Sequence, residues 1–257
     1  MRRKTIINSI IIIITFLISF FGRQILSHFI KISFPSAVWQ VAFSYLWWIV
    51  PTVLILGLLY GFKNIASDIG IHKGVFTGLL FSIITVLPML VSSAIIGQIS
   101  EDLNLGELIQ TTIFAGFMEE YLFRGFLFGI LYRKTGWGFI PASILGALIF
   151  GLGHIYQGST FLETTGVFLV TSMGAVWFSW LFIEWNENLW IPIFMHTLMN
   201  FSWVLFEVSS NALGGFYVNL FRVITIALTV IITLFYDKKT GLRINRNNLF
   251  VNKSYNA

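Results

Sequence analysis

Long apolar runs separated by short polar segments organise this chain of 257 residues. An α-helix needs about 20 mostly apolar residues to cross the hydrocarbon core of a bilayer. Eight runs have about that length, and each is expected to be a helix because an open sheet leaves backbone polar groups unpaired in lipid. The eight runs cover residues 5–25, 39–62, 74–98, 108–132, 138–156, 163–184, 189–208 and 215–236. The pattern therefore predicts an all-α, polytopic membrane protein.

No internal repeat or second domain is visible between these runs. We expect a single transmembrane domain over residues 1–236, in which residues 108–208 carry the polar groups discussed below. The remaining segment, 237–257, is polar and is expected to be a loosely ordered cytoplasmic tail.

Composition supports the membrane assignment and narrows the chemistry. The chain is 56% hydrophobic and only 11% charged, against about 25% charged residues in an ordinary soluble domain. It contains no cysteine, which excludes disulfides, thiolate metal ligands and a cysteine nucleophile. Any catalysis must rest on Glu, His, Asn, Ser or Tyr side chains. The basic start of the chain precedes an apolar run without a small-residue cleavage site, so we expect a retained first span.

The basic residues report topology rather than a nucleic-acid partner, because they lie in short segments between apolar runs. If the N-terminus is cytoplasmic, twelve basic residues lie inside and two outside, and two more lie within spans. The twelve are Arg2, Arg3, Lys4, Lys63, Lys73, Arg133, Lys134, Lys238, Lys239, Arg243, Arg246 and Lys253; the two are Arg23 and Lys31; the last are Arg124 and Arg222. Both termini are therefore expected in the cytoplasm of a multi-pass cell-membrane protein, and Arg222 is expected to pair with Glu207.

Three charged residues interrupt the fourth apolar run, at Glu119, Glu120 and Arg124. Each opposes membrane insertion by roughly 2.5–3.5 kcal/mol, so such residues face a protein interior and usually serve function. Residues four apart lie on the same side of a helix, which predicts a pair between Glu120 and Arg124. Glu119 faces another direction and is left free to act on something else. A charge cluster that only locks helix packing is the alternative.

Two further runs carry histidines. The fifth contains Phe150-x-x-x-His154, and the seventh contains His196-x-x-x-Asn200 shortly after Pro192, which suits a first turn or a kink. Each pattern alone is also explained by a hydrogen bond between packed helices. If the chain is counted at 1.5 Å per residue from the cytoplasmic border, Glu119 lies about 20 Å deep, His154 about 25 Å and His196 about 12 Å. A tilt or a kink must bring them together.

Taken together, a glutamate, two histidines and an asparagine on three helices suit the activation of water against an amide. A carboxylate and an imidazole can remove a proton from water, and further donors can stabilise the oxyanion that develops. These residues predict peptide hydrolysis in a polar cavity between the fourth, fifth and seventh helices.

The ordered set Glu119-Glu120-x-x-x-Arg124, Phe150-x-x-x-His154 and His196-x-x-x-Asn200 resembles the three motifs of the CAAX protease and bacteriocin-processing family. The resemblance runs from about Leu108 to Glu207. It implies that Glu119 activates water with help from His154, and that His196 and Asn200 stabilise the oxyanion. Glu120, Arg124 and Phe150 would then support the site.

The resemblance also implies an intramembrane endopeptidase surrounded by membrane lipids. Its substrate would be a peptide or protein with a hydrophobic, lipidated or leader-bearing end. We expect a glutamate protease without a cofactor. The alternative is a zinc site formed by Glu119, His154 and His196 with an open position for water.

Two functions of other classes stay open. One is a non-catalytic immunity or scaffolding protein of the same family that uses the motifs only as a polar packing core. The other takes His154 and His196 as haem ligands or proton-relay groups, but it gives Glu119, Glu120, Arg124 and Asn200 no joint role.

Overall fold

The computed structural model describes residues 3–35, 37–101 and 104–253. Arg2 and the last four residues of the predicted tail, 254–257, lie outside this part. The described residues form helices and no named strand. The long helices are α1 (Arg3–Phe29), α2 (Ala37–Tyr60), α4 (Val75–Ile96), α8 (Phe139–Leu152), α9 (Phe161–Glu184), α10 (Trp190–Leu205) and α11 (Phe216–Thr240). The short ones are the 3-10 helices η1 (Phe62–Asn64) and η4 (Ile155–Gln157), and α3 (Ile65–Ile69).

Six helical segments in the described part of the chain are long and apolar enough to cross a membrane. They are Lys4–Phe29, Trp39–Tyr60, Val75–Ile96, Phe139–Gln157, Phe161–Glu184 and Phe216–Thr240. The structure therefore confirms an all-helical polytopic membrane protein but does not confirm the count of eight spans. The predicted spans 108–132 and 189–208, which carry Glu119 and His196, are helical without meeting the same criteria.

The predicted span 108–132 lies in one continuous helical run of unusual geometry. Its parts are α5 (Leu105–Ile109), the π-helix η2 (Gln110–Phe114), α6 (Ala115–Glu120), the π-helix η3 (Tyr121–Phe128) and α7 (Gly129–Lys134). A π-turn is one residue wider than an α-turn, is rare, and is frequent at functional sites. All eight residues of η3 are buried, so the wide turns lie in the interior of the bundle.

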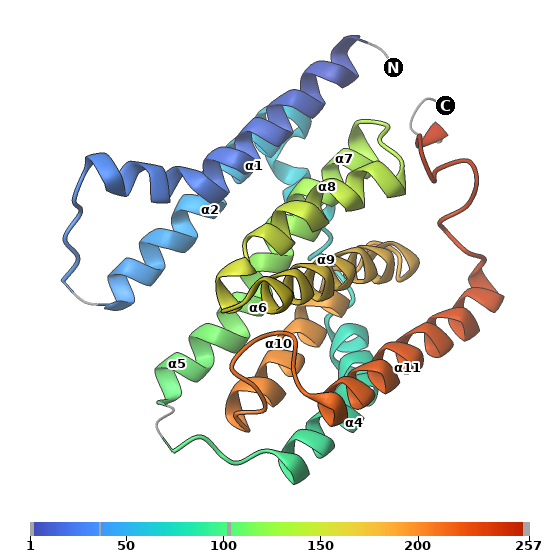
Figure 1. The fold of residues 1–257 in the computed structure, drawn as a ribbon. Helices are drawn as coiled ribbons and strands as arrows, with labels where there is room; N and C mark the ends of the chain where they lie inside the picture. The colour runs from blue at the N-terminus through green and yellow to red at the C-terminus, as the bar shows by residue number, and fades with distance from the viewer. Residues whose placement is uncertain (1–2, 36, 102–103, 254–257) are drawn as a thin grey trace.

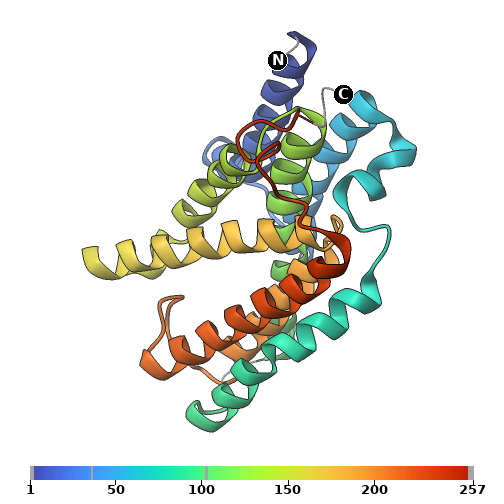
Figure 2. The ribbon, with the colours of Figure 1, turned by 90° about the vertical axis from the view of Figure 1, so that its right-hand side faces the viewer.

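The run from α5 to α7 passes through the middle of the molecule (Figure 1). The helix α10 packs against α4 and α6, α8 packs against α9 and η3, and the α1–α2 hairpin flanks η3 from the other side. In the view turned by 90°, α4 and α11 lie side by side along one edge of the bundle (Figure 2). The site residues predicted from the sequence are therefore carried by the central helices.

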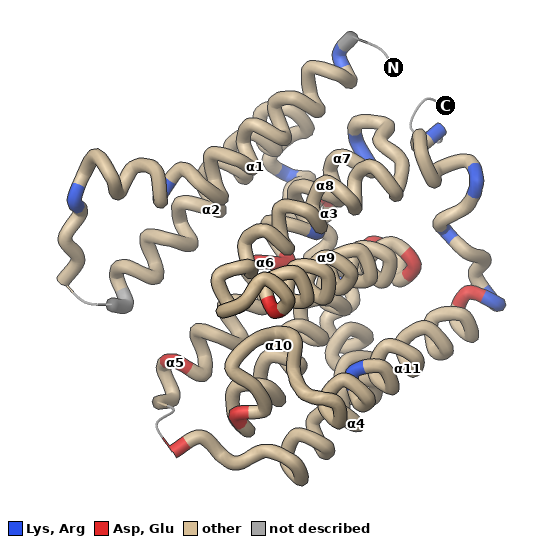
Figure 3. The backbone as a smooth tube through the Cα atoms, in the orientation of Figure 1, with Lys and Arg blue, Asp and Glu red and all other residues tan. Residues whose placement is uncertain are grey.

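Three of the connections that the sequence assigns to the cytoplasm meet on one face. Arg133 lies in the last turn of the central run, in α7. Its guanidinium donates to the backbone carbonyls of Ser67 and Asp68 and pairs with Glu187 at 2.8 Å. Lys134 pairs with the Asp68 carboxylate at 2.8 Å. Most other charged residues also lie at the periphery of the backbone trace, while acidic residues beside the α6 label lie inside the bundle (Figure 3).

The described part of the tail is docked rather than loose, which corrects the expectation from its polar composition. Its backbone bonds to the start of α8: Gly138 N–H donates to the Phe250 carbonyl at 3.1 Å. The fully buried carboxylate of Glu184, at the end of α9, accepts the backbone N–H groups of Arg243 at 2.8 Å and Ile244 at 3.1 Å. A buried carboxylate is costly unless donors satisfy it, and the tail supplies two.

The expected pair between Arg222 and Glu207 is wrong. Arg222 lies over the ring of Trp203 at 4.6 Å and donates to the carbonyl of Ala212 at 2.9 Å. Glu207 instead accepts a hydrogen bond from the Ser100 hydroxyl. The loop after α10 turns back on itself, so that Glu207 faces the end of α4 and Arg222 faces α10.

Candidate active site

A fully buried carboxylate, Glu120 at the end of α6, is the centre of the polar cluster. Its Oε1 accepts from Arg124 Nη1 at 2.9 Å and from His196 Nδ1 at 2.7 Å. The pair that the four-residue spacing predicts is therefore present, and it lies in the interior, since Arg124 is only 2% exposed. The His196 imidazole, on α10, is the third group of this buried cluster.

Glu119 points away from this pair. Its side chain is 24% exposed, and its Oε2 is buried without a hydrogen-bond partner. That oxygen lies 3.9 Å from His196 Nε2, which is longer than a hydrogen bond. The sequence expectation that Glu119 has no partner on its own helix agrees with this arrangement.

His196 therefore stands between two carboxylates. A carboxylate only accepts hydrogen bonds, so the contact with Glu120 requires that Nδ1 carry the proton. The other ring nitrogen, Nε2, then faces Glu119. A second group that fixes one imidazole nitrogen also fixes the orientation of the other. Glu120 thus orients the ring, and Glu119 is the group it is oriented toward.

Close packing of α6 on α10 makes this contact possible. A Cβ atom on Gly116 would lie 2.4 Å from Thr197 Oγ1 and 2.9 Å from Thr197 N. Real Cβ atoms do not approach other atoms so closely. Glycine at position 116 therefore lets the helix that bears Glu119 approach the helix that bears His196.

We predict that Gly116→Ala separates α6 from α10, because the methyl group meets backbone as well as side chain. The expected result is a loss of about 1–3 kcal/mol from overpacking and a weaker link between Glu119 and His196. Gly174→Ala is the matched control: Gly174 is also inside a helix, yet a Cβ there would meet nothing within 4 Å. The control should gain up to about 1 kcal/mol. Equal thermal unfolding midpoints for the two variants in detergent would refute this account.

Aromatic rings enclose the cluster. The guanidinium of Arg124 lies 4.6 Å from the ring centre of Phe150 and 5.5 Å from that of Phe178. His196 contacts the same two rings, at 6.4 Å and 5.9 Å between centroids. Stacking on rings stabilises a cation that has left water, so the two phenylalanines help to hold Arg124 in the interior.

His154 lies just past the end of α8, not inside a helix as the run 138–156 suggests. Its Nδ1 lies 2.7 Å from the backbone carbonyl of Phe150, and the two rings are 4.4 Å apart. A carbonyl accepts only, so Nδ1 carries the proton and a neutral ring keeps its lone pair on Nε2. His154 is not hydrogen-bonded to Glu119. Its link to the cluster is indirect, because the ring of Phe150 contacts both His154 and His196.

Asn200 lies one turn after His196. Its Nδ2 donates to the backbone carbonyl of Thr111 at 3.0 Å, within the wide turn η2. One amide hydrogen is therefore engaged in holding α10 against the central run, and the carboxamide keeps a second N–H. The resemblance gives Asn200 an oxyanion role, and this contact adds a packing role.

Known proteins match the segment of the chain that carries these site residues. Residues 101–202 match the family described as Type II CAAX prenyl endopeptidase Rce1-like. A Bacillus subtilis (strain 168) protein named "Putative membrane peptidase YdiL" is 33% identical over 93 residues, which are 36% of this chain. Residues 101–202 therefore resemble the CAAX protease family. The aligned segment covers 34% of the relative's length, and no solved structure matches the chain.

The matched segment holds all three motifs and excludes α1, α2 and α4. Two residues of the surroundings were not found from the sequence. Phe178 on α9 is one of 27 phenylalanines and belongs to no motif. Tyr45 on α2 lies within electrostatic range of Glu119 and packs its ring 5.7 Å from Phe114. No sequence signal marks either residue, because both reach the site through helix packing.

The zinc alternative does not correspond to an assembled ligand set in the described structure. In the described part of the chain, no group of three or more His, Asp and Glu side chains could hold a metal ion. Glu119, His154 and His196 thus form no such group. The Nδ1 contacts of the two histidines leave both Nε2 atoms free.

Proposed function

We propose that this protein is an intramembrane endopeptidase in which Glu119 activates a water molecule for attack on a peptide carbonyl. The observation that carries the proposal is the unpartnered Oε2 of Glu119, 3.9 Å from an imidazole nitrogen whose ring Glu120 holds in place. The family supports a CAAX-type membrane endopeptidase in general, and the roles below are our assignment.

In the proposed reaction, Glu119 takes a proton from water, with help from the free Nε2 of His154. The water oxygen bonds to the carbonyl carbon, and the carbonyl oxygen becomes an oxyanion. A protonated His196 Nε2 and the second N–H of Asn200 donate to it, and Glu120 at 2.7 Å from Nδ1 balances the imidazolium charge. The C–N bond then breaks, and the amine leaves with the proton that Glu119 held.

The substrate we propose is a peptide with a hydrophobic, lipidated or leader-bearing end. The site lies among membrane-spanning helices with apolar outer faces, so that a substrate able to partition into the bilayer can reach it. The compact chain, with short connections and no long soluble insert, favours a hydrophobic or leader-bearing peptide.

Part of the hydrogen bonding in the polar cluster also fits the scaffold alternative. Glu120, Arg124, His196 and Asn200 bond to one another or to backbone, as a polar packing core would. One oxygen of Glu120, Oε2, and Oε2 of Glu119 are both buried without a donor, which is destabilising. The carboxylate of Glu120 is nevertheless bonded through Oε1, whereas that of Glu119 forms no hydrogen bond in the described structure. This difference favours the enzyme over the scaffold.

The test is cleavage of a panel of hydrophobic peptides by the purified protein in detergent, with and without a strong chelator. We expect cleavage in both conditions. Cleavage that stops with chelator and returns with added zinc would replace the metal-free mechanism by the zinc one. If no peptide of the panel and no membrane-extracted peptide is cleaved, the scaffold function takes precedence.

A further inference from the structure

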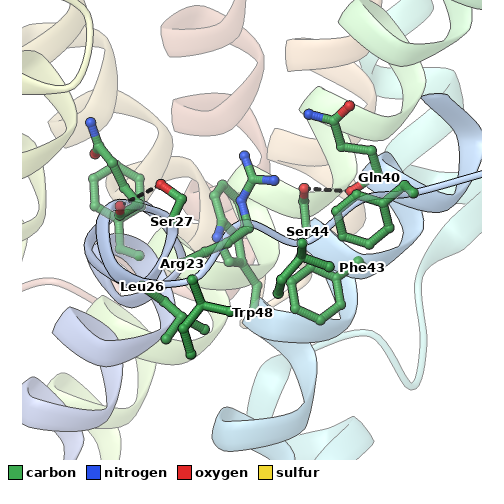
Figure 4. A pocket seen from close by; sticks show the side chains of 12 residues that line it. Arg23, Leu26, Ser27, Gln40, Phe43, Ser44 and Trp48 are labelled. Carbon is green, nitrogen blue, oxygen red and sulfur yellow. Dashed lines mark hydrogen bonds between the residues drawn. The ribbon is translucent and has the colours of Figure 1, made fainter. Parts of the chain in front are cut away.

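A pocket of about 750 Å³ lies between the C-terminal part of α1 and the N-terminal part of α2. Among its twelve lining residues, the polar side chains that carry the argument are Arg23, Gln24 and Gln40. Figure 4 shows Arg23 between Ser27 of α1 and Ser44 of α2, with the ring of Trp48 beneath it. Neither the family match nor the mechanism above uses any of these residues.

The pocket has a positive charge without a counter-ion. Arg23 is half-buried, and within the described residues it forms no ion pair and no side-chain hydrogen bond. The sequence explains why: residues 1–67 contain six Lys and Arg but no Asp or Glu. A half-buried guanidinium whose five N–H groups lack partners is a site for an anion.

The hydrogen-bond donors of the pocket lining that have no partner are also suited to bind an anion. Ser27 and Ser44 donate their hydroxyl protons to carbonyls of their own helices, Gln24 at 2.7 Å and Gln40 at 2.8 Å. The side-chain amides of Gln24 and Gln40 form no hydrogen bond in the described structure. A guanidinium and two carboxamides are thus available, and no carboxylate lines the pocket to oppose a negative ligand.

The walls of the pocket are fixed. Trp47 Nε1 donates to the carbonyl of Ile18 across the hairpin at 3.0 Å. A Cβ atom on Gly22 would lie 3.1 Å from the Trp47 ring, so glycine lets the two helices approach just before Arg23. Phe20 on the inner wall packs edge-on against Phe123 of the core at 5.2 Å. The spacing between α1 and α2 is therefore built into the core.

Apolar side chains surround the pocket on its outer side. It lies at the ends of two membrane-spanning helices, and the side chains around it are strongly exposed, with Phe29 at 82%, Trp39 at 61% and Ile30 at 54%. Aromatic side chains of this kind are frequent at the level of lipid headgroups. A ligand that fits carries an anionic head next to Arg23 and an apolar part along these side chains.

We propose that this pocket binds the phosphate headgroup of an anionic membrane phospholipid, with Arg23 as the main ligand and Gln24 and Gln40 as neutral donors. The planar guanidinium can bond two phosphate oxygens at once. A phosphate group is favoured over a peptide carboxylate because the pocket opens toward lipid-facing side chains. The proposal is independent of the peptidase function.

The test uses native mass spectrometry of the full chain in detergent, titrated with phosphatidylglycerol and, separately, with phosphatidylcholine. We expect one phosphatidylglycerol to bind more tightly than the others and more tightly than phosphatidylcholine. Arg23→Gln should weaken this binding at least about tenfold, since a charge-assisted hydrogen bond is lost. Arg23→Lys keeps the positive charge but lacks the planar guanidinium. Its affinity for phosphatidylglycerol should lie between those of the wild type and Arg23→Gln. Unchanged melting of the lipid-free variants would show that they are folded.

The matched control is Lys31→Gln, which removes a cation from the same hairpin at a residue outside the pocket lining. It should bind phosphatidylglycerol as the wild type does. Equal loss in Lys31→Gln and Arg23→Gln would mean general surface attraction and overturn the proposal, as would wild-type binding by Arg23→Gln. Displacement of the lipid by inorganic phosphate alone would reassign the pocket to a free anion. Displacement by a peptide with a free C-terminal carboxylate, but not by its amide, would reassign it to a peptide.

Discussion

Glu119→Gln is expected to lower the rate of peptide cleavage by about 10²–10⁴-fold, the usual contribution of a general base. The amide has the same shape but cannot accept the proton from water. Folding should be unaffected, because Glu119 Oε2 has no hydrogen-bond partner to lose and the side chain is partly exposed. The measurement is kcat and KM for a cleaved peptide, together with the thermal unfolding midpoint in detergent.

The control for this variant is Glu107→Gln, on the same helical run. Glu107 is exposed near the start of α5, where its backbone N–H bonds to the Asn104 side chain. It should cleave as the wild type does. If Glu119→Gln cleaved at the wild-type rate while folded, Glu119 would not be the base, and the proposed mechanism would be wrong.

Glu120→Ala is expected to have the largest effect on stability, a loss of about 3–5 kcal/mol. Removal of one partner from a buried pair leaves an uncompensated charge, and Arg124 is only 2% exposed. His196 loses its Nδ1 partner in the same step. Thermal or denaturant-induced unfolding in detergent should show the loss, and cleavage should fall with it.

Two comparisons make this prediction specific. Glu187→Gln breaks the pair with Arg133, in which the glutamate side chain is 42% exposed, and should cost less than about 1 kcal/mol. The double variant Glu120→Leu/Arg124→Leu removes both buried charges and should recover much of the stability, but not the activity, because His196 is no longer oriented. A Glu120→Ala variant as stable as Glu187→Gln would contradict a buried, coupled pair.

Local sequence signals predicted most of the helices. The run 163–184 corresponds to α9 (Phe161–Glu184), and the run 74–98 to α4 (Val75–Ile96). Helical spacing also predicted the contact between Glu120 and Arg124. These features depend on residues within one or two turns of each other, which is the information that a single sequence contains.

Features that depend on packing between distant segments were not predictable in this way. The wide turns η2 and η3 lie in a run whose composition is that of an ordinary apolar helix, and one of them is bonded by Asn200, 89 residues further along the chain. The position of His196 between two carboxylates depends on the close approach at Gly116. The estimated depths of Glu119 and His196 differed by about 8 Å at 1.5 Å per residue, yet their side chains meet.

The docked tail has a consequence for how the protein is made. Arg243 and Ile244, whose backbone N–H groups satisfy the Glu184 carboxylate, follow all the membrane-spanning helices of the described structure in the sequence. These helices are synthesised first, so the buried carboxylate stays without its tail donors until residues 243 and 244 have been synthesised. A chain that stopped at Thr240 would keep every helix and still have an incomplete interior at the end of α9. Correct membrane insertion is therefore a poor measure of whether this fold has been completed.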